Sequence, residues 1–150
     1  MRVVLQRVSQ AAVRLPEESP PREAGRIGTG ILALVGFTPD DGEEAFEWMA
    51  AKVAHLRIFP GEGNAMDRSL RDTDGGLLLV SQFTLYADVR KGRRPDFAAA
   101  APYAEAERLF DRFRAACEVE LPGRVASGVF GARMEVSLVN DGPVTLILER

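Results

Sequence analysis

The sequence is poor in the residues that most often mark a metal site or a covalent catalytic centre. Its 150 residues include one cysteine, Cys117, and one histidine, His55. A single cysteine excludes an internal disulfide and is typical of proteins from a reducing compartment. One histidine and one cysteine are too few for a tetrahedral zinc site, so we expect neither a metal nor a cofactor. Both residues fall on predicted helices, where packing or surface roles are the simpler interpretation.

Long hydrophobic runs and strong charge are also missing. No apolar segment approaches the roughly 20 residues that span a bilayer, so we expect no membrane partner. Residues 1–7 alternate like a strand and lack the apolar stretch and cleavage site of a signal peptide, which favours a cytoplasmic location. The formal net charge of −3 argues against indiscriminate binding of nucleic acid, and we expect no DNA partner, but it permits a local basic patch.

The patterning that is present predicts one domain, residues 1–150, of mixed α/β class. Alternating and β-branched segments predict strands, and apolar residues spaced three and four apart predict two helices. Several strands with only two helices indicate a layered β-sheet sandwich with the two helices packed on one face. The expected strands are 2–8, 11–15, 31–37, 77–86, 134–138 and 144–148; the expected helices are 43–58 and one beginning near Pro102; 16–25 is a loop or hairpin tip and 60–76 is irregular.

Polar residues interrupt the apolar strand that begins at Leu77. Ser81, Gln82, Phe83 and Thr84 follow four apolar residues in a row. The simple interpretation is a strand leaving the core, with the hydroxyls bonded to nearby backbone. Strand ends are also suitable places for rigid backbone N–H groups that stabilise a developing oxyanion. The Thr84 hydroxyl is a candidate nucleophile, although no neighbouring base in the sequence would activate it.

A second candidate lies between the two C-terminal strands, at Asn140-Asp141-Gly142-Pro143. In an arbitrary protein this sequence predicts a β-turn whose proline opens the next strand. Another glycine motif is less informative. Gly28-Thr29-Gly30-Ile31-Leu32-Ala33 matches G-x-G-x-x-A, but it enters a strand, whereas a dinucleotide-binding loop leaves a strand and opens a helix.

Taken together, Ser81-Gln82-Phe83-Thr84-Leu85 and Asn140-Asp141-Gly142-Pro143-Val144-Thr145 resemble the signature of the D-aminoacyl-tRNA deacylases, and the resemblance extends to Gln6-Arg7-Val8. It implies the fold of that family and a chiral-proofreading function. The substrate would be D-aminoacyl-tRNA, hydrolysed at its ester bond to free amino acid and tRNA. L-aminoacyl-tRNA would be rejected, and glycyl-tRNA would be cleaved because glycine has no side chain to exclude.

The resemblance also implies roles for individual residues. Ser81, Gln82, Phe83 and Thr84 would form the catalytic segment, which works with the vicinal ribose hydroxyl of the substrate. Gly142 and Pro143, joined by a cis peptide bond, would filter chirality from one subunit of a homodimer into the site of its twin. The remaining substrate-binding residues would be Asn140, Met134, which lines the pocket wall, and Arg7, which supports the Gly-Pro loop.

Two alternatives remain open at the level of the sequence. One is an esterase for another substrate that uses Ser81 or Thr84 as a nucleophile. The other is a tRNA-binding module of the same fold without turnover. A basic segment, Arg90-Lys91-Gly92-Arg93-Arg94, follows the catalytic strand; it is either a solvated loop or a contact for phosphates at the tRNA acceptor end.

Overall fold

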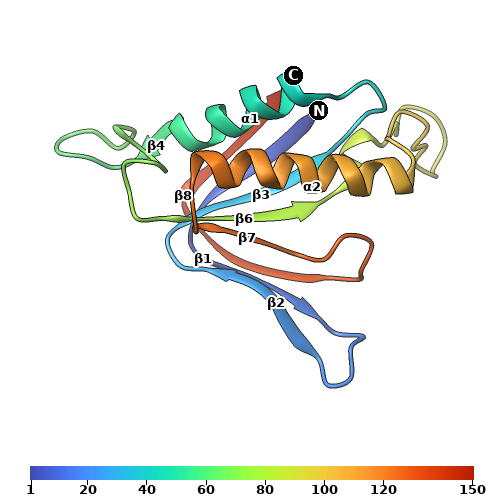
Figure 1. Cartoon of the computed structure of the whole chain (residues 1–150), viewed down its shortest axis with the longest axis horizontal. Coiled ribbons are helices and arrows are strands. Elements are labelled where there is room, and N and C mark those ends of the chain that lie inside the picture. The colour runs from blue at the N-terminus through green and yellow to red at the C-terminus, as the bar shows by residue number, and fades with distance from the viewer.

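A long N-terminal strand and a long C-terminal strand run side by side through the fold. In the computed structural model, which describes residues 1–150, β1 (Arg2–Leu15) pairs antiparallel with β8 (Glu135–Glu149) along almost its whole length. The two chain ends therefore meet, and the backbone N–H of Arg150 donates to the carbonyl of Met1 at 3.1 Å. Figure 1 shows the two termini beside each other.

The opposite edge of β1 pairs with two different strands. Its first half pairs with β3 (Gly30–Gly36), and its second half pairs with β2 (Arg22–Ile27). Beyond β3 the sheet continues, in parallel, with β6 (Gly76–Ser81) and then β7 (Val125–Ser127). Because β1 changes partners midway, its second half, with β2 and the start of β8, turns away from the first half (Figure 1).

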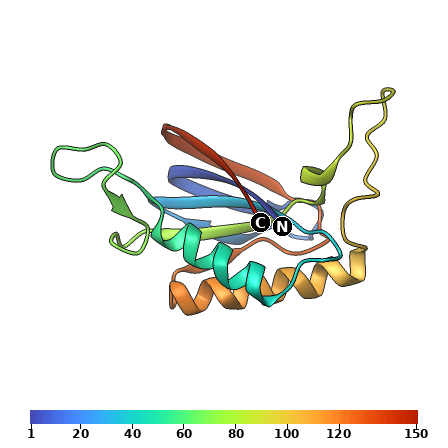
Figure 2. The same cartoon turned by 90° about the horizontal axis from the view of Figure 1, so that it is seen from above.

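Two helices cover one face of this sheet, as predicted. They are α1 (Glu43–His55) and α2 (Tyr103–Glu120), which lie side by side across it (Figures 1 and 2). The core between helices and sheet holds 25 buried residues, and in it the Phe37 ring makes edge contacts with Phe46 and Phe113. Burial of this much apolar surface is the main stabilising contribution to the fold.

The turned half of the sheet covers the other face. A second cluster of seven buried residues lies there, joining Val8 and Val13 of β1 to Leu32 of β3 and to Leu78 and Val80 of β6. Alternate residues of β3 and β6 thus enter different cores, as expected for strands buried on both faces. The prediction of a mixed α/β layered sandwich with two helices on one face is confirmed.

The remaining elements are small. A two-stranded ribbon of β4 (Arg57–Phe59) and β5 (Arg68–Ser69) lies beyond the end of α1, and a 3-10 turn, η1 (Phe83–Tyr86), follows β6. No helix of the structure is both long and apolar enough to cross a membrane.

Several predicted boundaries are wrong. Residues 2–15 form one strand and not two joined at Ser9-Gln10, because β8 follows β1 across that point through a shift in register. The two C-terminal strands are likewise one element. The tip predicted at 16–25 is shorter, since β2 begins at Arg22, and the short strand β7 carries too few apolar residues to predict.

Two elements end earlier than predicted. Helix α1 stops at His55 because Leu56 takes an extended conformation, which carries Ile58 and Phe59 into the core as part of β4. Strand β6 stops at Ser81, where its neighbour β3 also ends. The N–H of Gln82 donates to the carbonyl of Val35 at 2.7 Å, and the chain then turns into η1. The strand predicted to reach residue 86 therefore loses its pairing partner.

The close parallel pairing of β3 with β6 generates a test of the fold. Gly30 faces Gly76, and a Cβ atom on Gly30 would lie 1.9 Å from the Gly76 carbonyl oxygen. We expect Gly30→Ala to lower the free energy of unfolding by about 2–3 kcal/mol in urea titrations, because the strands must separate. Gly28→Ala is the matched control, since nothing lies within 4 Å of its Cβ position. Equal stability of the two variants would contradict this packing.

Candidate active site

A cavity of about 550 Å³ opens where β6 ends. It is bounded by the end of β6, the first residue of η1, the start of α2 and the segment that leads into β8. Most of its lining is apolar. The lining residues are Val80, Ser81, Gln82, Phe83, Tyr103, Ala106, Phe130, Gly131, Ala132, Met134 and Val136.

The polar side of the cavity is the chain that leaves β6. Phe83 and Thr84 begin η1, and the first amides of such a turn have no acceptor within the turn itself. No side chain caps η1. Thr84 adjoins the cavity without lining it, and its hydroxyl oxygen accepts a hydrogen bond from the Gln82 side-chain amide. The site thus offers backbone donors at a fixed strand end.

Aromatic residues form the facing wall. Tyr103 and Phe130 meet edge to face with ring centroids 5.2 Å apart. Gly131 has a φ of +73°, and a Cβ atom there would lie 1.9 Å from the Tyr103 hydroxyl. Sequence reasoning did not identify these three residues as part of the site, and the Tyr103 side chain is exposed. The sequence contains one indication of this wall: the aromatic residue Phe130 lies between Gly128 and Gly131, outside any segment with helical or strand periodicity.

No aspartate, glutamate, histidine or lysine lines the cavity. His55 lies on the exposed surface of α1, with its Nε2 3.2 Å from a carboxylate oxygen of Glu120. Cys117 is packed in the main core, where burial raises the pKa of its thiol well above the usual range. No group of three potential metal-ligating side chains is found in the structure. The polar groups that the cavity lining offers to a ligand are therefore backbone groups, hydroxyls and the Gln82 amide.

The second predicted constellation forms a bend in the middle of β8. Gln6 pairs with Thr145 and Val8 with Asn140, so a single residue of β1, Arg7, faces four residues of β8. The Asn140 side chain closes the bend. Its Oδ1 accepts from the Val144 N–H at 2.9 Å, and its Nδ2 donates to the Val144 carbonyl at 3.3 Å. Asn140 therefore shapes the chain around Gly142-Pro143.

The side chain of Arg7 stabilises this bend through hydrogen bonds to the backbone. Its side chain is 10% exposed, and its guanidinium donates to the carbonyl of Asp141 at 2.8 Å and to the carbonyl of Ile58. The Asp141 carboxylate lies 3.3 Å away. Gly142 has a φ of +150°, and a Cβ atom there would lie 2.7 Å from the Val144 nitrogen. The Gly142–Pro143 bond is cis, in agreement with the resemblance.

The cavity and the bend lie at opposite ends of the sheet. The structure brings Ser81, Gln82, Phe83 and Met134 together at one end, and Arg7, Asn140, Gly142 and Pro143 together at the other. Ser81 and Arg7 differ by four register positions, roughly 13 Å along the strands, and the two strand spacings from β6 through β3 to β1 add roughly 10 Å across them. In Figure 2 the red bend of β8 is at the left, and the yellow-green segment after β6 is at the right.

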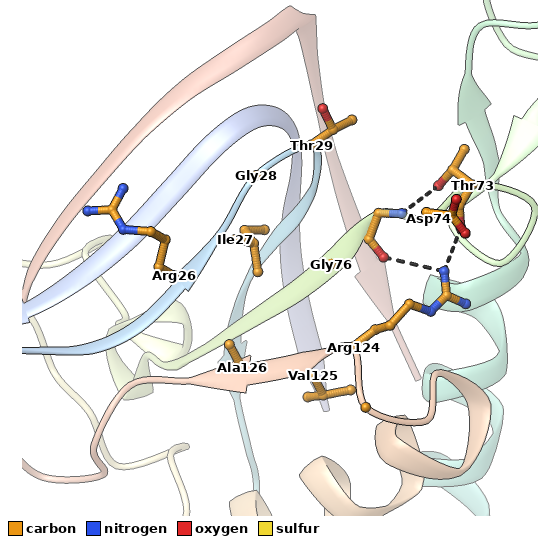
Figure 3. Close-up of a pocket in the computed structure, with 12 residues that line it drawn as sticks. Arg26, Ile27, Gly28, Thr29, Thr73, Asp74, Gly76, Arg124, Val125 and Ala126 are labelled. Carbon is orange, nitrogen blue, oxygen red and sulfur yellow. Dashed lines mark hydrogen bonds between the residues drawn. The ribbon is translucent and has the colours of Figure 1, made fainter.

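A more polar depression lies between β2, β6 and β7 (Figure 3), and it contains Gly28 and Thr29 of the G-x-G-x-x-A motif. These residues connect β2 to β3 and do not open a helix, so the prediction that the motif enters a strand is confirmed. The Arg124 guanidinium donates to the carbonyls of Thr73, at 2.5 Å, and Leu70, at 3.2 Å. Arg124 therefore holds the turn before β6.

Comparison with known proteins identifies similar chains across the whole sequence. The sequence profile of the family described as D-Tyr-tRNA(Tyr) deacylase matches residues 4–149. A D-aminoacyl-tRNA deacylase of Stenotrophomonas maltophilia (strain K279a) is 56% identical over 149 residues, which cover 99% of both chains. One of Nitratidesulfovibrio vulgaris (strain DP4) is 51% identical over 154 residues, covering 99% of this chain and 93% of the relative.

Two solved structures share the fold. One, described as a c-Myc DNA unwinding element binding protein, superposes with a TM-score of 0.91 at 38% identity and covers 100% of this chain and 99% of its own. The other, described as a probable eukaryotic D-amino acid tRNA deacylase, superposes with a TM-score of 0.82 at 23% identity, over 98% and 97% of the two chains. At that identity the second comparison shows the fold alone.

The contacts of Arg7 predict a large effect of its removal on stability. Arg7→Ala is expected to lower the free energy of unfolding by about 2–4 kcal/mol, because two backbone carbonyls lose their donor and Asp141 loses its counter-ion. Arg14→Ala is the matched control on the same strand. Its guanidinium is exposed and 3.4 Å from Glu135, so a change within about 0.5 kcal/mol is expected. Equal losses in chemical denaturation would show that Arg7 does not support the bend.

Proposed function

The chain belongs to the D-Tyr-tRNA(Tyr) deacylase family, and we propose that it hydrolyses the ester bond of D-aminoacyl-tRNA in a chiral-proofreading role. The products are the free D-amino acid and intact tRNA. The observation that carries this proposal is the cavity at the end of β6, which holds the Ser81-Gln82-Phe83 segment. Relatives more than 50% identical over nearly their whole length carry the name of this activity.

The composition of the cavity suits ester hydrolysis without a covalent intermediate. The ester carbon takes up a water oxygen, the carbonyl oxygen becomes an oxyanion, and the bond to the ribose oxygen then breaks as that oxygen is protonated. We assign the backbone N–H groups of Phe83 and Thr84 to the oxyanion. Because no carboxylate, histidine or lysine lines the cavity, we assign part of the proton transfer to the vicinal ribose hydroxyl of the substrate. Alignment of a labile ester supplies the rest of the rate enhancement.

We propose that the working enzyme is a homodimer in which the partner's Gly142 and Pro143 close the cavity. Within one chain the bend of β8 lies far from Phe83, so it cannot select among substrates bound there. Arg7 and Asn140 hold the bend in a fixed shape. A rigid backbone wall at the α-carbon excludes any L side chain by steric collision. This exclusion does not depend on the identity of the amino acid.

The surface of β8 around the bend has features of a protein–protein interface. Val139 and Ile147 of β8 are exposed, and one edge of β8 has no strand partner in the chain. Exposed apolar residues on an unpaired strand edge favour association with another chain. The proposed substrate, charged tRNA, is used by ribosomes in the cytoplasm, and we propose that compartment for this protein.

The central test compares the two enantiomers. We expect D-tyrosyl-tRNA to be deacylated and L-tyrosyl-tRNA to remain largely intact when both are followed side by side by release of labelled amino acid. Glycyl-tRNA is expected to be cleaved, because glycine carries no side chain to be excluded. Ser81→Ala and Thr84→Ala are expected to remain active and to retain chiral selection. No carboxylate or histidine lines the cavity to activate either hydroxyl as a nucleophile.

Two other outcomes would point to the alternative functions. Equal rates on the D and L substrates, with an acyl-enzyme trapped on Ser81 or Thr84, would indicate a nucleophilic esterase of different specificity. Binding of tRNA with no release of either enantiomer would indicate a binding module. Both outcomes contradict the proposed function.

The dimer is tested by complementation. Ala132→Trp fills the cavity, and Gly142→Ala forces the bend to move, so each variant alone is expected to be inactive. When the two are unfolded together and refolded, half of the dimers are mixed, and each mixed dimer holds one intact site. About a quarter of wild-type activity should therefore return. Mixing the variants without unfolding is the control. No recovery from correctly refolded mixed dimers would mean that each chain selects its own substrate.

A further inference from the structure

Residues 88–96, here called the basic arm, project from the rim of the cavity. The arm is closed at its base by two backbone hydrogen bonds, from Asp88 N–H to the Asp96 carbonyl at 2.7 Å and from Asp96 N–H to the Asp88 carbonyl at 2.9 Å. Gly92, near the middle, has a φ of +73° and nothing within 4 Å of its Cβ position. Figure 2 shows the segment between η1 and α2 extending away from the rest of the fold.

Both ends of the basic arm are fixed to the cavity. The chain enters it from Phe83 and leaves it through Phe97, and these two rings meet edge to face with centroids 4.9 Å apart. It then passes through buried Ala101, whose N–H donates to the Phe37 carbonyl at 2.9 Å, and reaches Tyr103 on the facing wall. The arm therefore has a defined position relative to the cavity, although it makes no contact with the core.

Three positive charges on the basic arm have no partner. Lys91, Arg93 and Arg94 are exposed, and no carboxylate lies within 4 Å of them. The neighbouring charges are already engaged. Arg90 pairs with Asp88 at 2.6 Å, which lowers the pKa of that carboxyl, and the Asp96 carboxylate accepts from the Ala98 N–H at 2.7 Å. Four basic residues and two acidic ones therefore share this segment in a chain with a net charge of −3.

We propose that the basic arm binds phosphates of the RNA strand whose charged 3′ end occupies the cavity. This inference rests on the proposed function, since the arm begins and ends at the cavity that would hold the aminoacyl ester. In a solvated loop without a ligand, we would expect the charges to be paired or dispersed over the surface. These three charges are unpaired, and only Gly92 separates Lys91 from Arg93 and Arg94. From its base to Gly92 the arm reaches roughly 13 Å, enough to lie beside several nucleotides.

Phosphate contacts have a measurable signature, because each contact releases condensed counterions. The logarithm of affinity falls with the logarithm of salt concentration by roughly 0.7–0.9 per phosphate neutralised. Three contacts therefore account for roughly 2–3 units of slope. They carry no sequence information, so the arm would orient tRNAs of any sequence alike.

The test removes the three charges while keeping polar side chains of similar size. Lys91→Gln/Arg93→Gln/Arg94→Gln is compared with Lys52→Gln/Arg71→Gln/Arg114→Gln, which removes the same charge from exposed positions on α1, after β5 and on α2. Binding of uncharged tRNA is measured by fluorescence anisotropy between 50 and 200 mM salt. The arm variant is expected to bind at least about tenfold more weakly, with a slope lower by roughly 2–3, and the control variant to stay within about twofold.

Measurements of deacylase activity distinguish an error in the proposed role of the basic arm from an error in the proposed function. On D-tyrosyl-tRNA the arm variant is expected to show a raised KM with kcat nearly unchanged. On D-tyrosyl-adenosine, which has no phosphate, it should match the wild type. Equal tRNA affinity and salt slope in the two triple variants would overturn the arm proposal, even if the wild type deacylates both substrates. Failure of the wild type on both substrates would refute the proposed function, while the binding experiment would still decide the role of the arm.

Discussion

The antiparallel pairing of β1 with β8 is the constraint on which the other features depend. It joins the chain ends, and its shifted register lets the second half of β1 turn over the far face of β3 and β6. The same shift leaves Arg7 opposite four residues of β8, so the extra residues must leave the plane of the sheet. The bend at Gly142-Pro143 is therefore a consequence of strand register, and Arg7 gives it a fixed shape.

The cavity has a similar origin in strand pairing. Strands β3 and β6 end together, and the hydrogen bond from Gln82 to Val35 is their last link. The chain that continues has no neighbour to pair with, so it turns and presents backbone donors beside an apolar hollow. A site built in this way is positioned by the core beneath it, while its own side chains contribute little charge. That composition is consistent with the proposed mechanism, in which the substrate supplies a hydroxyl group and a second subunit supplies the backbone wall.

Charge and shape are thus divided between different parts of the chain. No carboxylate, lysine, arginine or histidine lines the cavity, and three unpaired positive charges lie on the basic arm. Electrostatic attraction acts over several ångströms and tolerates imprecise geometry, whereas selection at an α-carbon requires a rigid contact. In the proposed enzyme, the charges on the extended basic arm and the backbone wall in the bend at Gly142-Pro143 would meet these two demands separately.

The sequence by itself determined the elements whose signal is local. Apolar residues spaced three and four apart predicted both helices, and the apolar run at 77–80 predicted a core strand. Ser81-Gln82-Phe83 and Gly142-Pro143 were identified as polar or rigid residues at positions where packing does not require them. Tertiary structure decided what depends on distant pairing. The continuity of β1 past Ser9-Gln10, the approach of Phe130 and Gly131 to Phe83, and the distance of Gly142 from that cavity arise from contacts between residues far apart in the chain, which leave no periodic trace in the local sequence.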